Sequence, residues 1–157
     1  MPTPTPAATE AQIRHIHAQW HAAIIARDLE ALMSLYADHA HFESPSVLAI
    51  ASAQAAPTGS TSAPTGNLTG KPAIRHFFAT GFAQLANTFA DWYRTGDFFS
   101  NGGQLVWEYP RVTPTGEQTD LVEFMDIEAG LIVAHRVYWG WRGLQSLLAV
   151  AESNHRA

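Results

Sequence analysis

A predicted β-hairpin at residues 117–141 constrains the fold more than any other stretch of this chain. Apolar and polar side chains alternate over residues 121–127, which is the period-2 pattern of a β-strand. Gly130 follows in a short turn, where it can adopt positive φ. Residues 131–141 are rich in Ile, Val, Tyr and Trp and are predicted to form the returning strand.

A turn centred on Ala129 places Glu123 directly opposite His135 on one face of this hairpin. The other residues on that face are apolar: Leu121, Met125, Leu131, Val133, Val137 and Trp139. An acid beside an imidazole among apolar neighbours can transfer protons near neutral pH. The alternative interpretation is a satisfied buried pair, or an edge pair in solvent, with no chemical role.

Length and composition indicate a single globular domain. The chain has 157 residues, of which 46% are hydrophobic and 15% charged, so it can build a core and is not a disordered chain. The net charge of −5 gives no basic surface for nucleic acid, and no apolar run is long enough to span a membrane. Without cysteine and without a signal-peptide pattern, we expect a cytoplasmic protein.

The predicted organisation is a disordered tail at residues 1–8 and one domain at residues 9–152. Thr9 and Gln12 form a capping-box pattern at the start of the first helix. Residues 46–70 form an uncharged, low-complexity insertion rich in Ala, Ser, Thr, Pro and Gly. This insertion is either a mobile surface loop or a lid over a cavity.

The element order predicts an α+β fold. Two helices, a short strand at residues 39–44 and a third helix from Lys71 precede four antiparallel strands between residues 94 and 141. The second helix carries Tyr36 inward in this interpretation. Helices segregated against a strongly curved antiparallel sheet make a cone-shaped roll that encloses a cavity.

This order, with ARDLEALMSLYADHAHFESP near the start and LVEFMDIEAGLIVAHRVYWGW near the end, resembles the nuclear-transport-factor-2-like superfamily. Within it, the chain is similar to SnoaL-like polyketide cyclases and ketosteroid isomerases. The resemblance implies that Trp20 stands where the isomerases have an oxyanion-donating Tyr, Ser44 where they have the Asp base, and Glu123 where they have a protonated Asp. A Ser is no carboxylate base, so the resemblance argues against ketosteroid isomerisation by that mechanism. A cyclase-like acid with a nearby His suits Glu123 and His135 better.

We therefore predict Glu123 and His135 as catalytic residues, acting without a cofactor on a small, largely apolar or polycyclic molecule. The predicted substrate-binding residues are mostly aromatic: His17, Trp20, Ser44, Phe78, Trp107, Tyr109 and Trp139. The reaction classes considered are isomerisation, cyclisation, dehydration and epoxide hydrolysis. The alternative is a non-catalytic module of the same fold that binds a small molecule or dimerises.

Two surface features of the sequence carry further predictions. His39, His41 and Glu43 alternate on one strand face, but we read them as a solvated or subunit-contact face and predict no metal site. A homodimer is predicted through the outer face of the sheet, whose apolar residues are Val106, Val122, Phe124, Ile132 and Tyr138.

Overall fold

The computed structural model describes residues 9–48, 65–84, 97–110, 112–113, 116–117 and 120–154 of the chain. Its helices are α1 (Glu10–Ala26), α2 (Leu29–Ser34), α4 (Lys71–Gln84) and α6 (Trp141–Asn154). Its strands are β1 (Tyr36–Glu43), β2 (Asn67–Thr69), β3 (Phe98–Ser100), β4 (Gln104–Glu108), β5 (Val112–Thr113), β6 (Gly116–Glu117), β7 (Leu121–Glu128) and β8 (Leu131–Trp139). The predicted α+β order is confirmed.

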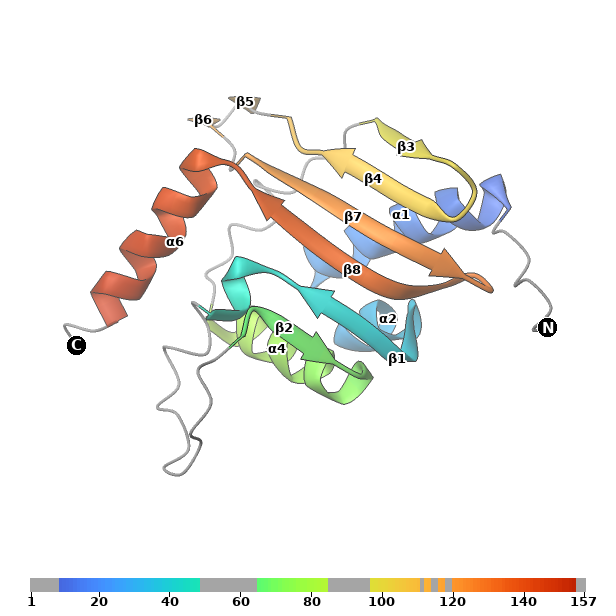
Figure 1. Cartoon of the computed structure of the whole chain (residues 1–157), viewed down its shortest axis with the longest axis horizontal. Helices are drawn as coiled ribbons and strands as arrows, with labels where there is room; N and C mark the ends of the chain where they lie inside the picture. The colour runs from blue at the N-terminus through green and yellow to red at the C-terminus, as the bar shows by residue number, and fades with distance from the viewer. Residues whose placement is uncertain are drawn as a thin grey trace.

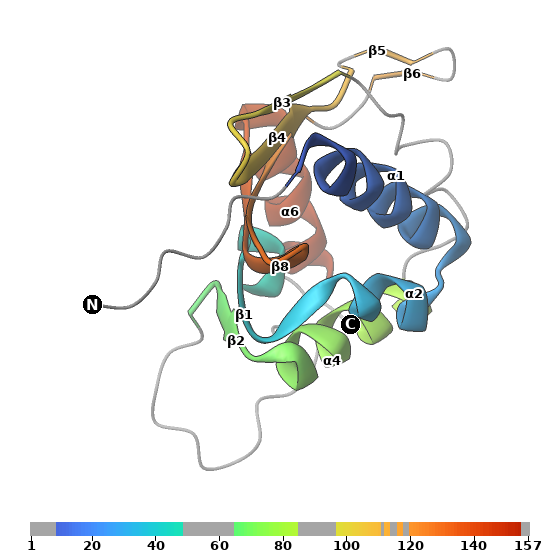
Figure 2. The ribbon, with the colours of Figure 1, turned by 90° about the vertical axis from the view of Figure 1, so that its right-hand side faces the viewer.

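The main sheet has six strands in the order β2-β1-β8-β7-β4-β3, and β5 and β6 form a separate pair (Figure 1). Helices α1, α2 and α4 cover one face of the curved main sheet (Figure 2). The sheet does not close, because β2 and β3 remain as its edges. One pairing differs from the predicted antiparallel sheet, since β1 runs parallel to β8. The long crossover from β1 to β8 carries the intervening helix and strands.

Local capping signals set the beginnings of the first two helices. The Thr9 side chain accepts a hydrogen bond from the Gln12 backbone N–H, and the Gln12 side chain accepts one from the Thr9 N–H, as the sequence predicts. Asp28 caps α2 through the Ala31 N–H at 2.9 Å. The predicted position of Tyr36 in the second helix was wrong, because α2 ends at Ser34 and Tyr36 begins β1.

The β7–β8 hairpin forms as predicted, but its register is shifted by two residues. Glu123 lies opposite Val137, and Met125 lies opposite His135. Half of the shift comes from a two-residue turn in which Ala129 and Gly130 both have positive φ (49° and 77°). The other half comes from a bulge at Val133, which follows the Ile127–Ile132 pair and precedes the Asp126–Ala134 pair.

Each one-residue slip reverses the face that a strand's side chains occupy, so two slips restore it. Leu131 and Ile132 lie between the turn and the bulge and are therefore reversed: Leu131 is exposed, whereas Ile132 is fully buried. The predicted inward position of Leu131 and outward position of Ile132 were wrong for this reason. His135 lies beyond the bulge and keeps the predicted inner face, where it is buried.

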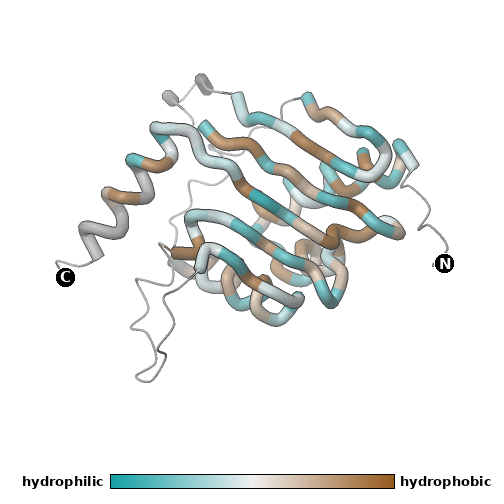
Figure 3. The backbone as a smooth tube through the Cα atoms, viewed as in Figure 1, coloured by the Kyte–Doolittle hydropathy of each residue, from teal (hydrophilic) through white to brown (hydrophobic). Residues whose placement is uncertain are grey.

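The outer face of the sheet is mixed in polarity (Figure 3). Tyr138 is exposed there, but Arg136 pairs with Asp126 at 2.8 Å and lies over the ring of Phe124. The homodimer through this face stays a prediction.

The two ends of the predicted 46–70 insertion have defined structure. Val47 is buried in the core, and β2 pairs antiparallel with β1, so that Leu68 lies opposite Phe42. The residues between these ends, 49–64, lie outside the described part of the chain, as do residues 1–8. The choice between loop and lid therefore stays open.

Candidate functional site

Glu123 and His135 lie on the two central strands of the sheet and meet on its helix-covered face. His135 Nε2 is 2.5 Å from Glu123 Oε2, and the two residues are only 1% and 3% exposed. They are diagonal neighbours across the hairpin rather than opposed residues, and side chains of their length span that diagonal. The predicted pair is therefore present, although the register that joins them differs.

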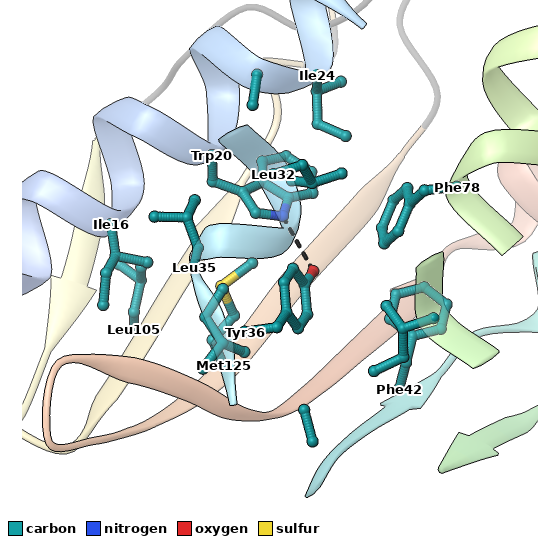
Figure 4. Packing of buried hydrophobic residues seen from close by; sticks show 14 of the residues in the cluster. Ile16, Trp20, Ile24, Leu32, Leu35, Tyr36, Phe42, Phe78, Leu105 and Met125 are labelled. Carbon is teal, nitrogen blue, oxygen red and sulfur yellow. Dashed lines mark hydrogen bonds between the residues drawn. The ribbon is translucent and has the colours of Figure 1, made fainter. Parts of the chain in front are cut away.

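The pair is one part of a longer buried chain of hydrogen bonds. His135 Nδ1 is 2.7 Å from the Tyr36 hydroxyl, and the Trp20 indole N–H donates to that same hydroxyl at 3.2 Å (Figure 4). On the other side, the Tyr109 hydroxyl donates to Glu123 Oε1 at 3.4 Å. The chain thus joins α1, the start of β1, both central strands and the residue that follows β4.

The donors and acceptors allow one consistent direction for these bonds. An indole N–H can only donate, so the Tyr36 oxygen accepts from Trp20. Burial raises the pKa of the Tyr36 hydroxyl far above its ordinary value, so Tyr36 keeps its proton and donates it to His135 Nδ1. His135 then carries its own proton on Nε2 and donates it to Glu123. Glu123 is the acceptor at the end of this chain.

Aromatic rings surround this chain of bonds on the helix side. Trp20 and Phe42 make edge-on contacts with the His135 ring, with centroids at 5.7 and 4.9 Å. Trp107 is the cross-strand partner of Glu123 and makes an edge-on contact with Trp20 at 5.4 Å. The acid and the imidazole therefore sit in a largely apolar setting.

The predicted substrate-binding residues fall into four groups. Trp20 and Tyr109 hydrogen-bond within the chain, whereas His17 and Trp107 pack beside it. Phe78 lies on α4 and reaches the ring of Tyr36. Ser44 and Trp139 are not joined to the chain by any hydrogen bond among the described residues; the Trp139 N–H donates to Ser44 Oγ at 3.3 Å instead.

Sequence reasoning missed three members of the site: Tyr36, His21 and Phe42. Tyr36 was predicted in a helix, but it is the first residue of β1, whose alternation of exposed and buried residues begins only at His39. Phe42 lies on the same strand and was not among the predicted site residues. His21 follows His17 by one helical turn, and that spacing was the available signal.

His21 is a buried histidine held in its neutral form. Its Nδ1 is 2.8 Å from the His17 carbonyl oxygen, which can only accept, so Nδ1 carries the proton. Protonation would place a charge on Nε2, which is buried without a hydrogen-bond partner. Burial lowers the pKa of His21 to about 4, against the contribution of that backbone bond, and burial also lowers the pKa of His17.

These shifts predict a loss of stability in mild acid. Between the unfolded pKa of 6.5 and the folded pKa of about 4, the unfolded chain binds more protons at His21, so stability falls as the pH falls. The stability that neutral, buried His21 provides is fully present above pH 6.5. The free energy of unfolding in urea should drop by about 2 kcal/mol from pH 7 to pH 5 through His21, and His17 should add to this.

His21→Phe tests the assignment, because it keeps a ring and removes the titration. Its unfolding free energy should change less between pH 7 and pH 5 than that of the wild type. His15→Gln is the matched control, since His15 lies on the same helix and is exposed. An equal pH dependence in wild type and His21→Phe would contradict the prediction.

The strand face with His39, His41 and Glu43 is exposed in the single chain, which fits either predicted role, a solvated face or a subunit contact. Over the described ranges, no group of three or more His, Cys, Asp and Glu residues is arranged to hold a metal ion. None of the helices in those ranges is long and apolar enough to cross a membrane.

Comparison with protein families decides the classification. The family model for the SnoaL-like domain matches residues 17–135, which is well over half of the chain and contains Trp20, Tyr36, Tyr109, Glu123 and His135. The chain belongs to the SnoaL-like domain family. A search of curated proteins gave no match.

Solved structures agree with the fold of this SnoaL-like protein. A SnoaL-like protein of unknown function from Burkholderia thailandensis has a TM-score of 0.61 at 20% identity, covering 84% of this chain and 98% of that one. A protein with a cystatin-like fold from Methylobium petroleophilum has a TM-score of 0.59 at 15% identity, covering 86% and 80%. SalBIII, an epoxide hydrolase/cyclase-like enzyme with a role in pyran ring formation in polyether salinomycin, has a TM-score of 0.52 at 16% identity, covering 84% and 93%.

Proposed function

We propose that this SnoaL-like protein is a cofactor-independent acid–base enzyme that acts on a small, largely apolar molecule. The observation that carries the proposal is the Glu123–His135 hydrogen bond inside the apolar core, with both residues almost fully buried. Replacing such a pair by apolar residues of similar volume is often neutral or stabilising, so stability alone is a weak reason for the pair. Proton transfer is a stronger one.

The direction of the hydrogen bonds assigns a separate role to each group. Glu123 accepts protons, because its carboxylate is the only acceptor at the end of the chain of donors from Trp20, Tyr36 and His135. His135 orients that carboxylate, since Tyr36 occupies its free lone pair on Nδ1. The Tyr109 hydroxyl, at a long 3.4 Å from Glu123, is the donor that can turn to a developing oxyanion on the substrate.

A carboxylate base that is hydrogen-bonded to His135 and Tyr109 supports reactions that begin with removal of a proton. Removal of a proton from carbon leads to isomerisation, cyclisation or dehydration, and removal of a proton from water leads to epoxide opening. The similarity to SalBIII, an epoxide hydrolase/cyclase-like enzyme, supports this range. The aromatic residues Trp20, Trp107 and Phe78 favour a planar or polycyclic substrate.

The burial of the pair favours one second candidate. Glu123 and His135 are shielded from solvent by the surrounding side chains, as in a purely structural polar network. A non-catalytic binding module of the same fold would keep the pair for that reason.

Proton exchange with solvent separates the two candidates. The wild-type protein is incubated in D₂O with enolisable cyclic ketones, and deuterium incorporation beside the carbonyl is followed by NMR. A parallel incubation with cyclic epoxides in ¹⁸O-labelled water follows ring opening by mass spectrometry. Acceleration of either reaction above the buffer rate supports the enzyme. Binding of these compounds without exchange or ring opening would support the binding module instead.

A further inference from the structure

Within the described part of the chain, three buried side-chain nitrogens have no hydrogen-bond partner, and their rings pack together. They are His17 Nε2, His21 Nε2 and Trp107 Nε1, each with less than 1 Å² exposed. The ring centroids are 4.5 Å apart for His17 and His21, 5.2 Å for His17 and Trp107, and 5.0 Å for His21 and Trp107. This cluster, here called the His–Trp cluster, joins two turns of α1 to the inner face of β4.

Unpartnered polar atoms in a core cost free energy, and native structures contain few of them. Here the three unpartnered nitrogens come from two turns of α1 and from the facing strand β4. Burial of apolar surface alone does not explain why polar side chains occupy these positions. Phenylalanine would fill any of the three places without the penalty. A single group that both donates and accepts hydrogen bonds, placed among the three rings, would serve at least His21 and Trp107.

The donor and acceptor properties of His21 Nε2 and Trp107 Nε1 indicate which chemical group would bind them. His21 Nδ1 donates to the His17 carbonyl, so Nε2 offers a lone pair, and the low pKa of His21 keeps that lone pair free at neutral pH. Trp107 Nε1 can only donate. The partner must therefore donate one hydrogen bond and accept another in the same place, which is what a hydroxyl group does. A carboxylate or an ether oxygen would satisfy Trp107 but not His21.

We propose that the His–Trp cluster is a binding subsite for a hydroxyl group on the substrate. Its place in the fold fits one ligand that reaches both the cluster and the acid. Trp107 is the cross-strand partner of Glu123, and the His21 ring lies 5.9 Å from the ring of Tyr109, which hydrogen-bonds to Glu123. The inference rests on the proposed function for the presence of an apolar substrate, and it narrows that substrate to a hydroxylated ring compound.

Phe98 packs against the edge of this subsite and is the cross-strand partner of Trp107. Its ring centroid is 4.8 Å from that of His17, it is partly exposed, and it belongs to β3, a three-residue strand at the edge of the sheet. Arg14 lies over the same ring on the solvent side, at 5.2 Å. Rotation of the Phe98 side chain at the sheet edge is the route that we propose for a ligand to reach the His17 side of the cluster.

The test uses pairs of probes that differ only at the oxygen: cyclohexanol, 1-indanol and 2-naphthol, each with its methyl ether. The ether still accepts from Trp107 but cannot donate to His21. We expect at least one alcohol to bind the wild-type protein about 10-fold more tightly than its ether, as one buried hydrogen bond allows. The indole N–H resonance of Trp107 should shift on binding of that alcohol in ¹H–¹⁵N spectra.

Trp107→Phe keeps a ring and removes the donor. It should weaken binding of that alcohol about 10-fold, while the melting temperature of the free protein changes little, because removal of an unpaired N–H offsets the smaller volume of phenylalanine. Trp141→Phe is the control, since Trp141 is exposed on α6. A lower melting temperature with unchanged alcohol affinity would show a packing role, and equal affinity within every alcohol–ether pair would overturn the subsite.

These outcomes are independent of the exchange assay. An alcohol preference in a protein that exchanges no deuterium and opens no epoxide would overturn the proposed chemistry and leave the hydroxyl subsite standing. Exchange activity that depends on Glu123, without any alcohol preference, would overturn the subsite alone.

Discussion

Glu123→Gln should lower the turnover of this SnoaL-like protein by about 10²-fold or more, which is the usual scale for loss of a general base. The substitution keeps the shape of the side chain and removes the carboxylate that ends the chain of donors. The amide oxygen can still accept from His135 Nε2, and the amide N–H₂ can donate to the Tyr109 oxygen. The variant should therefore fold, and its affinity for ligands should change much less than its turnover.

The measurement is the deuterium exchange or epoxide opening described above, with ligand affinity determined in parallel by calorimetry. Glu128→Gln is the matched control, because Glu128 lies on the same strand and is exposed. Its turnover should equal that of the wild type. If Glu123→Gln keeps full turnover on a substrate that the wild type converts, Glu123 is not the base and the proposed mechanism fails.

His135→Leu should lower the free energy of unfolding by about 3 kcal/mol or more, because it leaves the buried Glu123 carboxylate without its hydrogen bond from the imidazole. The buried Glu123 carboxylate would keep only its long bond to Tyr109, and the Tyr36 hydroxyl would lose its acceptor. Leucine fills a similar volume, so the loss reports the stranded polar groups rather than a cavity. Urea unfolding at pH 7 measures it.

The double variant Glu123→Leu with His135→Leu distinguishes this account from simple misfit. Once the carboxylate is also removed, no stranded charge remains, so the double variant should lose less stability than the sum of the two single variants. Arg136→Gln is the comparison on the outer face of the same strands. Arg136 and Asp126 are each about a quarter to a third exposed, and breaking that pair should cost about 1 kcal/mol. Strict additivity of the Glu123 and His135 effects would contradict the account.

Local patterns in the sequence were enough to predict most elements of this fold. The capping box at Thr9, the cap at Asp28 and the period-2 alternation in β7 act over a few residues, so the sequence states them directly. The inward position of Glu123 and His135 follows from the same alternation. This inward position was predicted correctly despite the wrong register, because a shift of two residues leaves each side chain on the same face of the strand.

The tertiary structure decided which groups the acid and the imidazole meet. Tyr36 reaches His135 because β1 runs parallel to β8 with an irregular register, and that pairing joins residues about a hundred positions apart. No local pattern encodes such a contact. The His–Trp cluster likewise exists only because α1 packs across β4, which brings His21 to Trp107. Period and capping are properties of neighbouring residues, whereas the hydrogen-bond partners of a buried side chain depend on which distant strand or helix the fold places against it.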